Sequence, residues 1–355
     1  RLTGVSRAGK RERGSINKRN GKTYHFSVNF FQDDMQTLYL KVMILKDFTI
    51  FTYMIPDEIK IKPVKPVLSG YISEALRLLK NETFPDEDSV HDIRVLMKKA
   101  RAAVKLVAHQ IDSEFFEREY MTFREAGRLL AEWRETSVHR KTLKSIRKSH
   151  EDLFSRLSGY PFLESIIATP LEFSSPGKAE SDRIEKIEEI LRKSLYRVRF
   201  QSFGEQDFRL MFQALESTYN EVAGIYLECR RKPRPGKIHS LRKRAKDLLY
   251  QLWFFRPMNP PVIKRIEKRL DSLTRDIGKY NDLEQLLQVI GYEPGNPENP
   301  PDINELLIII RDKQHNYLSD VWSEAYRLFC PGQKLVNLLG FRLLSVDLPS
   351  GAKIR

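Results

Sequence analysis

Cysteine is scarce in this chain of 355 residues, which contains only Cys229 and Cys330. Two thiols are too few for the disulfide framework that stabilises small secreted domains. They are also too far apart in sequence for a paired-thiol metal site. We therefore expect two buried free thiols and a reducing compartment.

Long apolar runs are also missing. No segment approaches the roughly twenty consecutive apolar residues that a membrane-spanning helix needs. No charged and then apolar leader with a small-residue cleavage site opens the sequence. We expect a cytoplasmic protein with no membrane partner.

Acidic residues are outnumbered by basic ones. Asp and Glu number 47 against 61 Lys and Arg, which gives a formal net charge of +14 and a pI near 9.6. This balance favours an acidic partner, either nucleic acid, an anionic membrane surface or a phosphate polymer, and composition does not choose among them. The chain length and a hydrophobic content of 41% are sufficient for two packed units.

Composition changes along the chain and divides it into five segments. The first is rich in Arg, Lys, Gly and Asn, which is typical of a disordered basic tail. The second contains the run Phe48–Tyr53, whose β-branched and aromatic residues indicate a short strand. Beyond it the hydrophobic period is helical, with prolines between amphipathic segments, and predicts bundle packing. The segments are 1–34 (basic tail), 35–66 (N-terminal extension of undefined structure), 67–175 (first helical bundle), 176–335 (second helical bundle) and 336–355 (C-terminal tail). The predicted helices that bear on function cover 90–110, 114–138, 237–256, 260–276 and 279–291.

A His-x-x-Arg-x-x-x-Lys pattern occurs twice. It begins at His91 and again at His239, an offset of 148 residues (239 − 91). A second landmark, Leu130–Glu135, aligns with Ile277–Asp282 at an offset of 147 (277 − 130). Because two landmarks agree on nearly one spacing, we predict an all-α fold of two halves related by internal duplication.

Five basic side chains share an arc of roughly 80° on the first of the two helices. Apolar residues such as Ile93 and Val104 occupy the opposite face, so this helix can bury one side and present a row of cations on the other. The cationic groups lie about 5 Å apart along the axis on average, a spacing that suits a linear polyanion. The five residues are His91, Arg94, Lys98, Arg101 and Lys105.

Like charges at this spacing repel one another, and the same helix face carries no acid. We infer that a bound anion compensates the charge. Arg offers forked donors, Lys a compact charge, and His a group whose protonation an anion favours, so the stripe suits phosphate. The alternative interpretation is a solvated charged face paired with acids of another helix.

The second copy is less basic than the first. His239, Arg242 and Lys246 keep the first three positions of the stripe, but Leu249 and Trp253 occupy the next two. Its far end is therefore expected to be drier. Three further cations, on the helices that follow the two copies, are expected to turn toward the stripes: Arg128, Arg134 and Arg275.

These stretches resemble the conserved-histidine α-helical domain family, known as CHAD. The resemblance covers roughly residues 67–330 and implies two four-helix bundles that face each other across a basic channel. It also implies binding of inorganic polyphosphate, often on polyphosphate granules. The motifs that carry it are His91–Val95 with Lys98, Lys99 and Arg101, then His239–Arg242 with Lys246 and Tyr250, and the helix ends Trp133–Glu135 and Tyr280–Leu283. By position, the channel residues are His91, Arg94, Lys98, Arg101, Lys105, His239, Arg242 and Lys246, with Arg128, Arg134 and Arg275 behind them.

The chain departs from the family pattern at two positions. Glu135 stands where the family usually has Asp, and Leu249 stands where a basic residue is expected. The resemblance then implies an asymmetric channel, with the His91 helix as the principal anion-binding element. The chain has no Glu-x-Glu-x-Lys motif of the triphosphate-tunnel enzymes to which family members are sometimes fused. We expect no catalytic residues, no bound metal and no cofactor.

Two other functions remain open at this level. The positive charge also suits non-specific binding of RNA or DNA, although the stripe contains no aromatic or amide side chain to stack or read bases. The pair His91–Asp92 is compatible with a metal-dependent phosphohydrolase of the His-Asp type, but the other histidines lack a fixed metal-ligand spacing. The sequence does not predict an oligomeric state.

Overall fold

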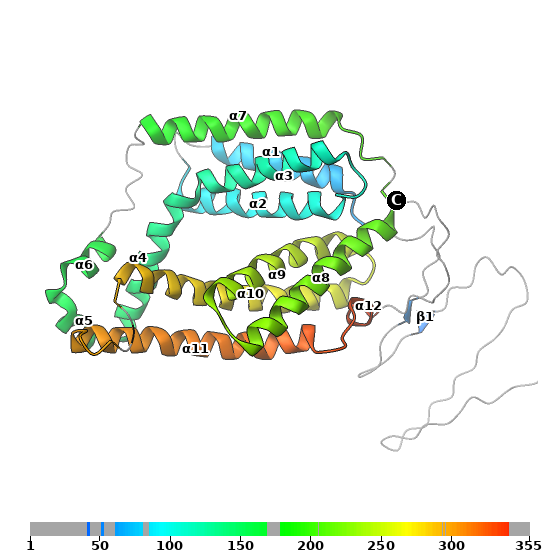
Figure 1. Cartoon of the computed structure of the whole chain (residues 1–355). Coiled ribbons are helices and arrows are strands. Elements are labelled where there is room, and N and C mark those ends of the chain that lie inside the picture. The colour runs from blue at the N-terminus through cyan, green and yellow to red at the C-terminus, as the bar shows by residue number, and fades with distance from the viewer. Residues whose placement is uncertain are drawn as a thin grey trace, which may run out of the picture. The chain divides into compact units, whose positions relative to one another are not determined.

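The fold is all-α, as the sequence predicts, and helices make up nearly all of the regular structure in the computed structural model (Figure 1). The structure describes residues 41–42, 51–52, 61–80, 85–168, 178–204, 206–292, 294 and 296–340. All of them belong to one unit, Lys41–Arg355. The predicted basic tail and most of the predicted C-terminal tail lie outside the described residues.

Two short strands lie in the predicted N-terminal extension. Strand β1 (Lys41–Val42) pairs antiparallel with β2 (Phe51–Thr52). Because β2 falls within the run Phe48–Tyr53, the predicted strand is confirmed at these two residues.

Four helices form the first bundle: α1 (Val64–Lys80), α2 (Glu87–Leu106), α3 (Ser113–Leu129) and α7 (Lys178–Phe200). Helix α2 packs on both α1 and α3, and α7 packs on α1 and α3. The predicted boundary at residue 176 assigns α7 to the second half, but its contacts place it with the first bundle. The apolar residues Ile187, Leu191 and Val198 recur at helical spacing on α7 and are buried there.

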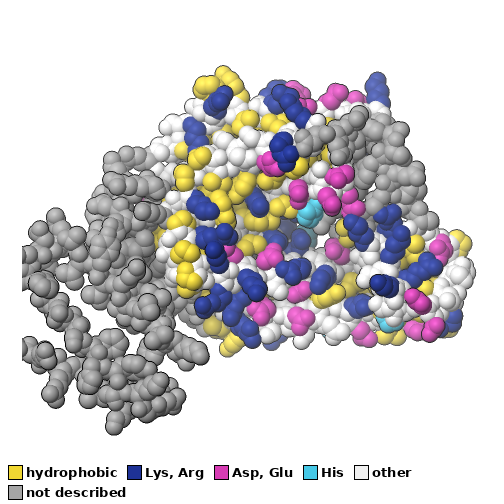
Figure 2. All heavy atoms as spheres, turned by 180° about the vertical axis from the view of Figure 1, so that it is seen from behind, with side chains coloured by type: hydrophobic (Ala, Val, Ile, Leu, Met, Phe, Trp, Pro, Cys, Tyr) yellow, Lys and Arg dark blue, Asp and Glu magenta, His cyan; other side chains and the backbone are white. Residues whose placement is uncertain are grey.

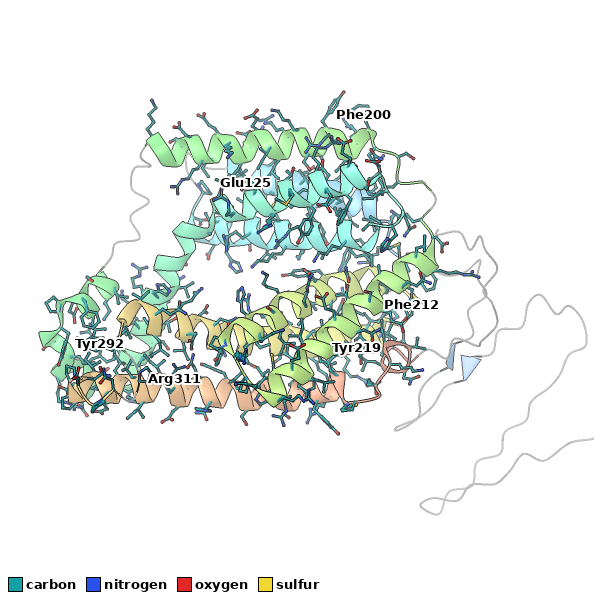
Figure 3. The ribbon with its side chains drawn as sticks, viewed as in Figure 1. Glu125, Phe200, Phe212, Tyr219, Tyr292 and Arg311 are labelled. Atoms are coloured by element: carbon teal, nitrogen blue, oxygen red, sulfur yellow. The ribbon has the colours of Figure 1, made fainter. Side chains whose placement is uncertain are left out.

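The second bundle consists of α8 (Phe208–Arg231), α9 (Pro235–Phe255), α10 (Pro260–Ile290) and α11 (Pro301–Phe329). Consecutive helices pack on each other, and α11 also packs on α8. Tyr219 of α8, labelled in Figure 3, is fully buried and donates a hydrogen bond to the Leu328 carbonyl of α11 at 2.9 Å.

A third group of helices follows α3. It comprises α4 (Ala131–Ser149), α5 (Glu151–Arg156), η2 (Leu157–Gly159) and α6 (Pro161–Ala168). Their apolar residues share a separate core with the ends of α10 and α11. A last short helix, α12 (Leu335–Leu338), follows α11. Helix α4 contacts α2, α3 and α10, so it connects the two bundles.

Two predicted helix boundaries are wrong. The predicted helix 114–138 ends at Leu129, where the chain turns at the buried Leu130 into α4. The predicted break near residue 277 does not occur, because Ile277 and Gly278 lie buried within α10. That helix ends at Gly291, whose φ of 74° is the left-handed conformation that glycine adopts at helix ends.

A buried carboxylate joins α3 to α7. Glu119 of α3 is fully buried and accepts hydrogen bonds from Ser194 and Arg197 of α7, while Arg118 lies 3.8 Å away. Burying a charge is costly unless partners surround it, so this group depends on α7 being in place.

We expect Arg197→Ala to destabilise the protein by about 3 kcal/mol, because it leaves a buried carboxylate without its main cation. Arg192→Ala is the matched control. Arg192 lies on the same helix and forms an exposed ion pair with Glu188. Losing this pair is expected to cost less than about 0.5 kcal/mol of stability. Urea denaturation measures both values. Equal losses would contradict the structural role of Glu119.

Candidate functional site

The two helices that begin the His-led motifs, α2 and α9, pack against each other. The Nζ of Lys105 on α2 binds Oδ2 of Asp247 on α9 at 2.7 Å. The side-chain amide of Gln251 on α9 donates to the Ala102 carbonyl of α2 at 3.3 Å. Ala102 and Ala103 are fully buried, and their small side chains allow this approach. Both cationic stripes therefore lie on adjacent helices.

The arginine of each motif is held by a carbonyl of the following long helix. Nη1 of Arg94 donates to the Gly127 carbonyl of α3 at 2.6 Å, and Nε of Arg242 donates to the Thr274 carbonyl of α10 at 3.1 Å. The arginines are 148 residues apart (242 − 94) and the carbonyls 147 (274 − 127), the same offsets that relate the sequence landmarks. The duplication stays a prediction, but both arginines have the same kind of anchor.

Cations from both helices surround His239. Partial desolvation lowers the pKa of this imidazole from its ordinary value of 6.5, and the positive charges of Lys243, Arg242 and Lys98 lower it further. Because Lys98 belongs to α2, its influence places it near His239 across the boundary between the bundles. His91 is exposed in the first turns of α2.

Arg101 lies one turn beyond Lys98 on α2. It is half-buried, and its Nε is buried without a hydrogen-bond acceptor among the described residues. A buried N–H group of a guanidinium gains free energy when an acceptor reaches it.

Acids of other helices pair with the far ends of the stripes, as the alternative interpretation expects there. Lys105 is paired with Asp247, as described above. Lys246 binds Oδ1 of Asp271 at 3.1 Å, and Arg275 binds Oδ2 of the same carboxylate at 2.8 Å. Desolvation by burial raises the pKa of Asp271, but the hydrogen bonds and positive charges of Arg275 and Lys246 outweigh it, so this pKa is lowered overall. These acids come from α9 and α10, so the local pattern of α2 gives no sign of them.

One of the arginines expected behind the stripes, Arg128, binds an acid of its own helix. Arg128 binds Glu125 within α3 at 2.8 Å, and Glu125 also binds Lys186 of α7 at 3.3 Å. Figure 3 shows Glu125 on the α7 side of α3. Arg128 is therefore linked to α7 through Glu125. The side chain of Arg134 lies outside the described residues.

Helix α4 adds cations that sequence reasoning missed. Its Lys141 binds Glu87 at the start of α2 at 2.5 Å, one turn before His91. Half-buried His139 and Arg140 precede Lys141 on the same helix. The sequence predicts one continuous helix over 114–138 and so gives no sign of this contribution. In the structure the chain turns at Leu130, and α4 runs toward α10.

Figure 2 shows how the charges gather on one face of the molecule. Lys and Arg side chains surround a hollow near the middle of this face, with carboxylates and a His side chain beside it. Among the described residues, no group of three or more His, Cys, Asp and Glu side chains is arranged to hold a metal ion. No described helix is both long and apolar enough to cross a membrane.

These features define an all-α protein in which two helical bundles meet through a pair of basic helices, one from each bundle. The CHAD domain family model matches residues 71–290, which is more than half of the chain, so the protein belongs to the CHAD domain family. No curated protein and no solved structure matches the chain. The matched region begins in α1 and ends with α10, so it contains both His-led helices.

Gly278 tests how tightly Arg242 is held. A Cβ added at Gly278 would lie 3.2 Å from Nε of Arg242, whereas one added at Gly224, within α8, meets nothing within 4 Å. Replacing an interior helix glycine by alanine ordinarily stabilises by about 1 kcal/mol. We expect Gly224→Ala to show this gain and Gly278→Ala to lose most of it, because Arg242 must move. Chemical denaturation measures both, and equal gains would show that Arg242 is not held here.

Proposed function

We propose that this protein binds inorganic polyphosphate, without catalysis, along the facing helices α2 and α9. The central residues are Arg94, Lys98 and Arg101 of α2 with His239 and Arg242 of α9. His91 and Lys105 extend the surface along α2, Lys246 and Arg275 extend it on the second bundle, and Arg128 and Arg134 remain predicted to lie behind it. Membership of the CHAD domain family supports this proposal.

The observation that carries the proposal is that α2 and α9, the two helices that bear the His-led stripes, pack directly against each other across the boundary between the bundles. Lys98 of α2 and Arg242 and Lys243 of α9 all lower the pKa of His239. Such crowding destabilises the unliganded protein. A polyanion bound along these helices would neutralise the cations. The relief of their mutual repulsion would then contribute to the binding free energy.

The geometry supports a chain of phosphates over a single small anion. Cationic groups recur about every 5 Å along α2, as expected for residues three or four apart on one helix face. Arg94 and Arg242 are each oriented by a backbone carbonyl, so little side-chain entropy remains to be lost when they bind phosphate. The buried Nε of Arg101 supplies a further donor.

The two halves are expected to contribute unequally. Lys246 is tied to Asp271, so a phosphate must compete with a carboxylate for this ammonium group. At the predicted offset of 147, Arg124 is the first-half counterpart of Asp271 (271 − 147), which puts a cation where the second half has an acid. We therefore propose that α2 contributes most of the affinity. We also propose that the protein acts in the cytoplasm, at polyphosphate granules.

The double variant Arg94→Ala with Lys98→Ala tests the binding site. We expect its affinity for polyphosphate to fall about 100-fold, since each lost charge-assisted contact is worth about 1.4 kcal/mol or more. The slope of log affinity against log salt should become shallower by about 2. Calorimetric titrations over a salt series measure both, and circular dichroism verifies the helical content.

The matched control is Arg192→Ala with Lys193→Ala, which removes the same charge from the exposed face of α7. Its affinity is expected to stay within about threefold of the parent, because distant exposed charges are screened. Equal effects of the two double variants would contradict the site. Competition with RNA separates the alternative function: RNA that displaces polyphosphate while polyphosphate fails to displace RNA would favour a nucleic-acid binder.

His239 should make binding depend on pH. Its pKa is low in the free protein, and the negative charge of bound phosphate must raise it. Binding therefore takes up a proton, and affinity should increase as the pH falls from about 8 to about 6. The unliganded fold should lose stability as the pH falls below the ordinary value of 6.5, because the unfolded chain binds the proton more tightly.

Titrations at several pH values, compared between the parent and His239→Gln, isolate this contribution. The comparison removes the titration of polyphosphate itself, which both proteins experience. A pH dependence that is identical in the two proteins would place His239 outside the binding surface.

A further inference from the structure

A cleft of about 580 Å³ lies beside the α2–α9 contact and is separate from the cluster around His239. Its walls come from four helices of both bundles, namely α1, α2, α9 and α10. Leu249 and Trp253 line it, and these are the two positions at which the second copy departs from the basic stripe. The polyphosphate proposal gives no role to either residue.

Three aromatic side chains line the cleft: Tyr71, Tyr250 and Trp253. Each is half-buried, so part of each side chain remains accessible. Burial raises the pKa of both tyrosines to about 12, which keeps their phenols protonated near neutral pH. Aromatic surface of this kind suits a flat ring, and stacking a base on it is worth about 1–3 kcal/mol.

The cleft also holds a buried acceptor. Glu267 is 7% exposed, and its Oε2 accepts hydrogen bonds from Nε and Nη2 of Arg256 at 3.1 and 2.6 Å. Its other oxygen, Oε1, is buried and has no hydrogen-bond partner among the described residues. A buried carboxylate oxygen without a donor is costly. An N–H group of a ligand would relieve that cost, and an aromatic amine or ring N–H beside the aromatic walls has the right chemistry.

Cations at the rim complete the arrangement. Lys99 of α2 and Lys264 and Lys268 of α10 line the cleft, in addition to Arg256. Lys99 lies 5.9 Å from the ring centroid of Tyr71, so charge and aromatic surface are adjacent. The two lysines of α10 are exposed and can follow a flexible phosphate group.

We propose that this cleft binds a purine nucleoside phosphate, with the base among Tyr71, Tyr250 and Trp253, a base N–H group donating to Glu267, and the phosphates on Lys99, Lys264 and Lys268. A bare phosphate chain would use the lysines and leave the aromatic surface and the buried acceptor unused. A polyamine would meet four cationic residues against two acidic ones in the lining. The nucleoside phosphate uses all three features.

Calorimetric titration of the full chain with adenosine and guanosine diphosphates tests the proposal. We expect saturable binding of at least one of them, about tenfold tighter than binding of inorganic pyrophosphate, because the base adds stacking and a hydrogen bond. Purine riboside diphosphate has neither an amino group nor a ring N1–H, and it should bind about tenfold more weakly than the better of the two.

Variants locate the site. Trp253→Ala should weaken nucleotide binding about tenfold or more, and Trp253→Phe should restore most of it, since a smaller aromatic ring still stacks. Lys99→Ala should weaken the diphosphate more than the nucleoside. Thermal melts verify that each variant is folded. If Trp253→Ala does not fold, Trp253→Phe still tests whether residue 253 contacts the nucleotide.

The double variant Arg94→Ala with Lys98→Ala separates this site from the proposed polyphosphate surface. It should lose polyphosphate binding and keep nucleotide binding within about threefold. If pyrophosphate binds as tightly as the nucleotides, or if Trp253→Ala leaves their affinity unchanged, the cleft is not a nucleotide site. If only short RNA binds and free nucleotides do not, the proposal is likewise overturned.

Discussion

The packing of α2 on α9 is the contact on which the rest of the structure depends, because it joins the two bundles along the helices that carry most of the motif cations. A charged helix face ordinarily turns to water, and α2 packs through its opposite, apolar face. Ile93, Met97 and Val104 on that face are buried, and burying each such side chain contributes about 1.5–3 kcal/mol to stability. Like-charge pairs on a helix surface cost only a few tenths of a kcal/mol each. Apolar burial therefore fixes the helices, and the crowded cations follow from where those helices lie.

Carboxylates relieve the crowding at the far ends of the stripes. Asp247 pairs with Lys105 near the end of α2, and Asp271 pairs with Lys246 and with Arg275 on α10. Near His239 the neighbouring charges that act on the imidazole are all positive. The far ends of the stripes are thus partly neutralised within the protein, and under the proposed function the polyanion supplies the compensating charge near His239.

Local pattern predicts the helices of the site well and their surroundings poorly. The predicted helices 90–110 and 237–256 correspond closely to α2 and α9 (Glu87–Leu106 and Pro235–Phe255), because a strong apolar period and proline breaks act within one segment. The ion pair between Lys105 and Asp247 leaves no local pattern in the sequence, because it forms only when two segments that are distant in sequence pack together. The same holds for α7, whose contacts lie with the first bundle although the chain reaches it after a long excursion through α4 to α6.

The cleft beside α9 cannot be predicted from the local sequence pattern either, because its walls come from four helices that meet only in the folded protein. The surroundings of Trp253 give a physical reason for this departure from the basic stripe. Nζ of Lys62 lies 3.2 Å from the ring centroid of Trp253, and desolvation by burial, together with the Arg256 charge, already lowers the pKa of Lys62. A cation at residue 253, as a regular stripe requires, would add repulsion to that pair, whereas an indole ring attracts a cation. At residue 253 the second stripe therefore carries an aromatic ring where a further cation would be repelled by Lys62 and Arg256.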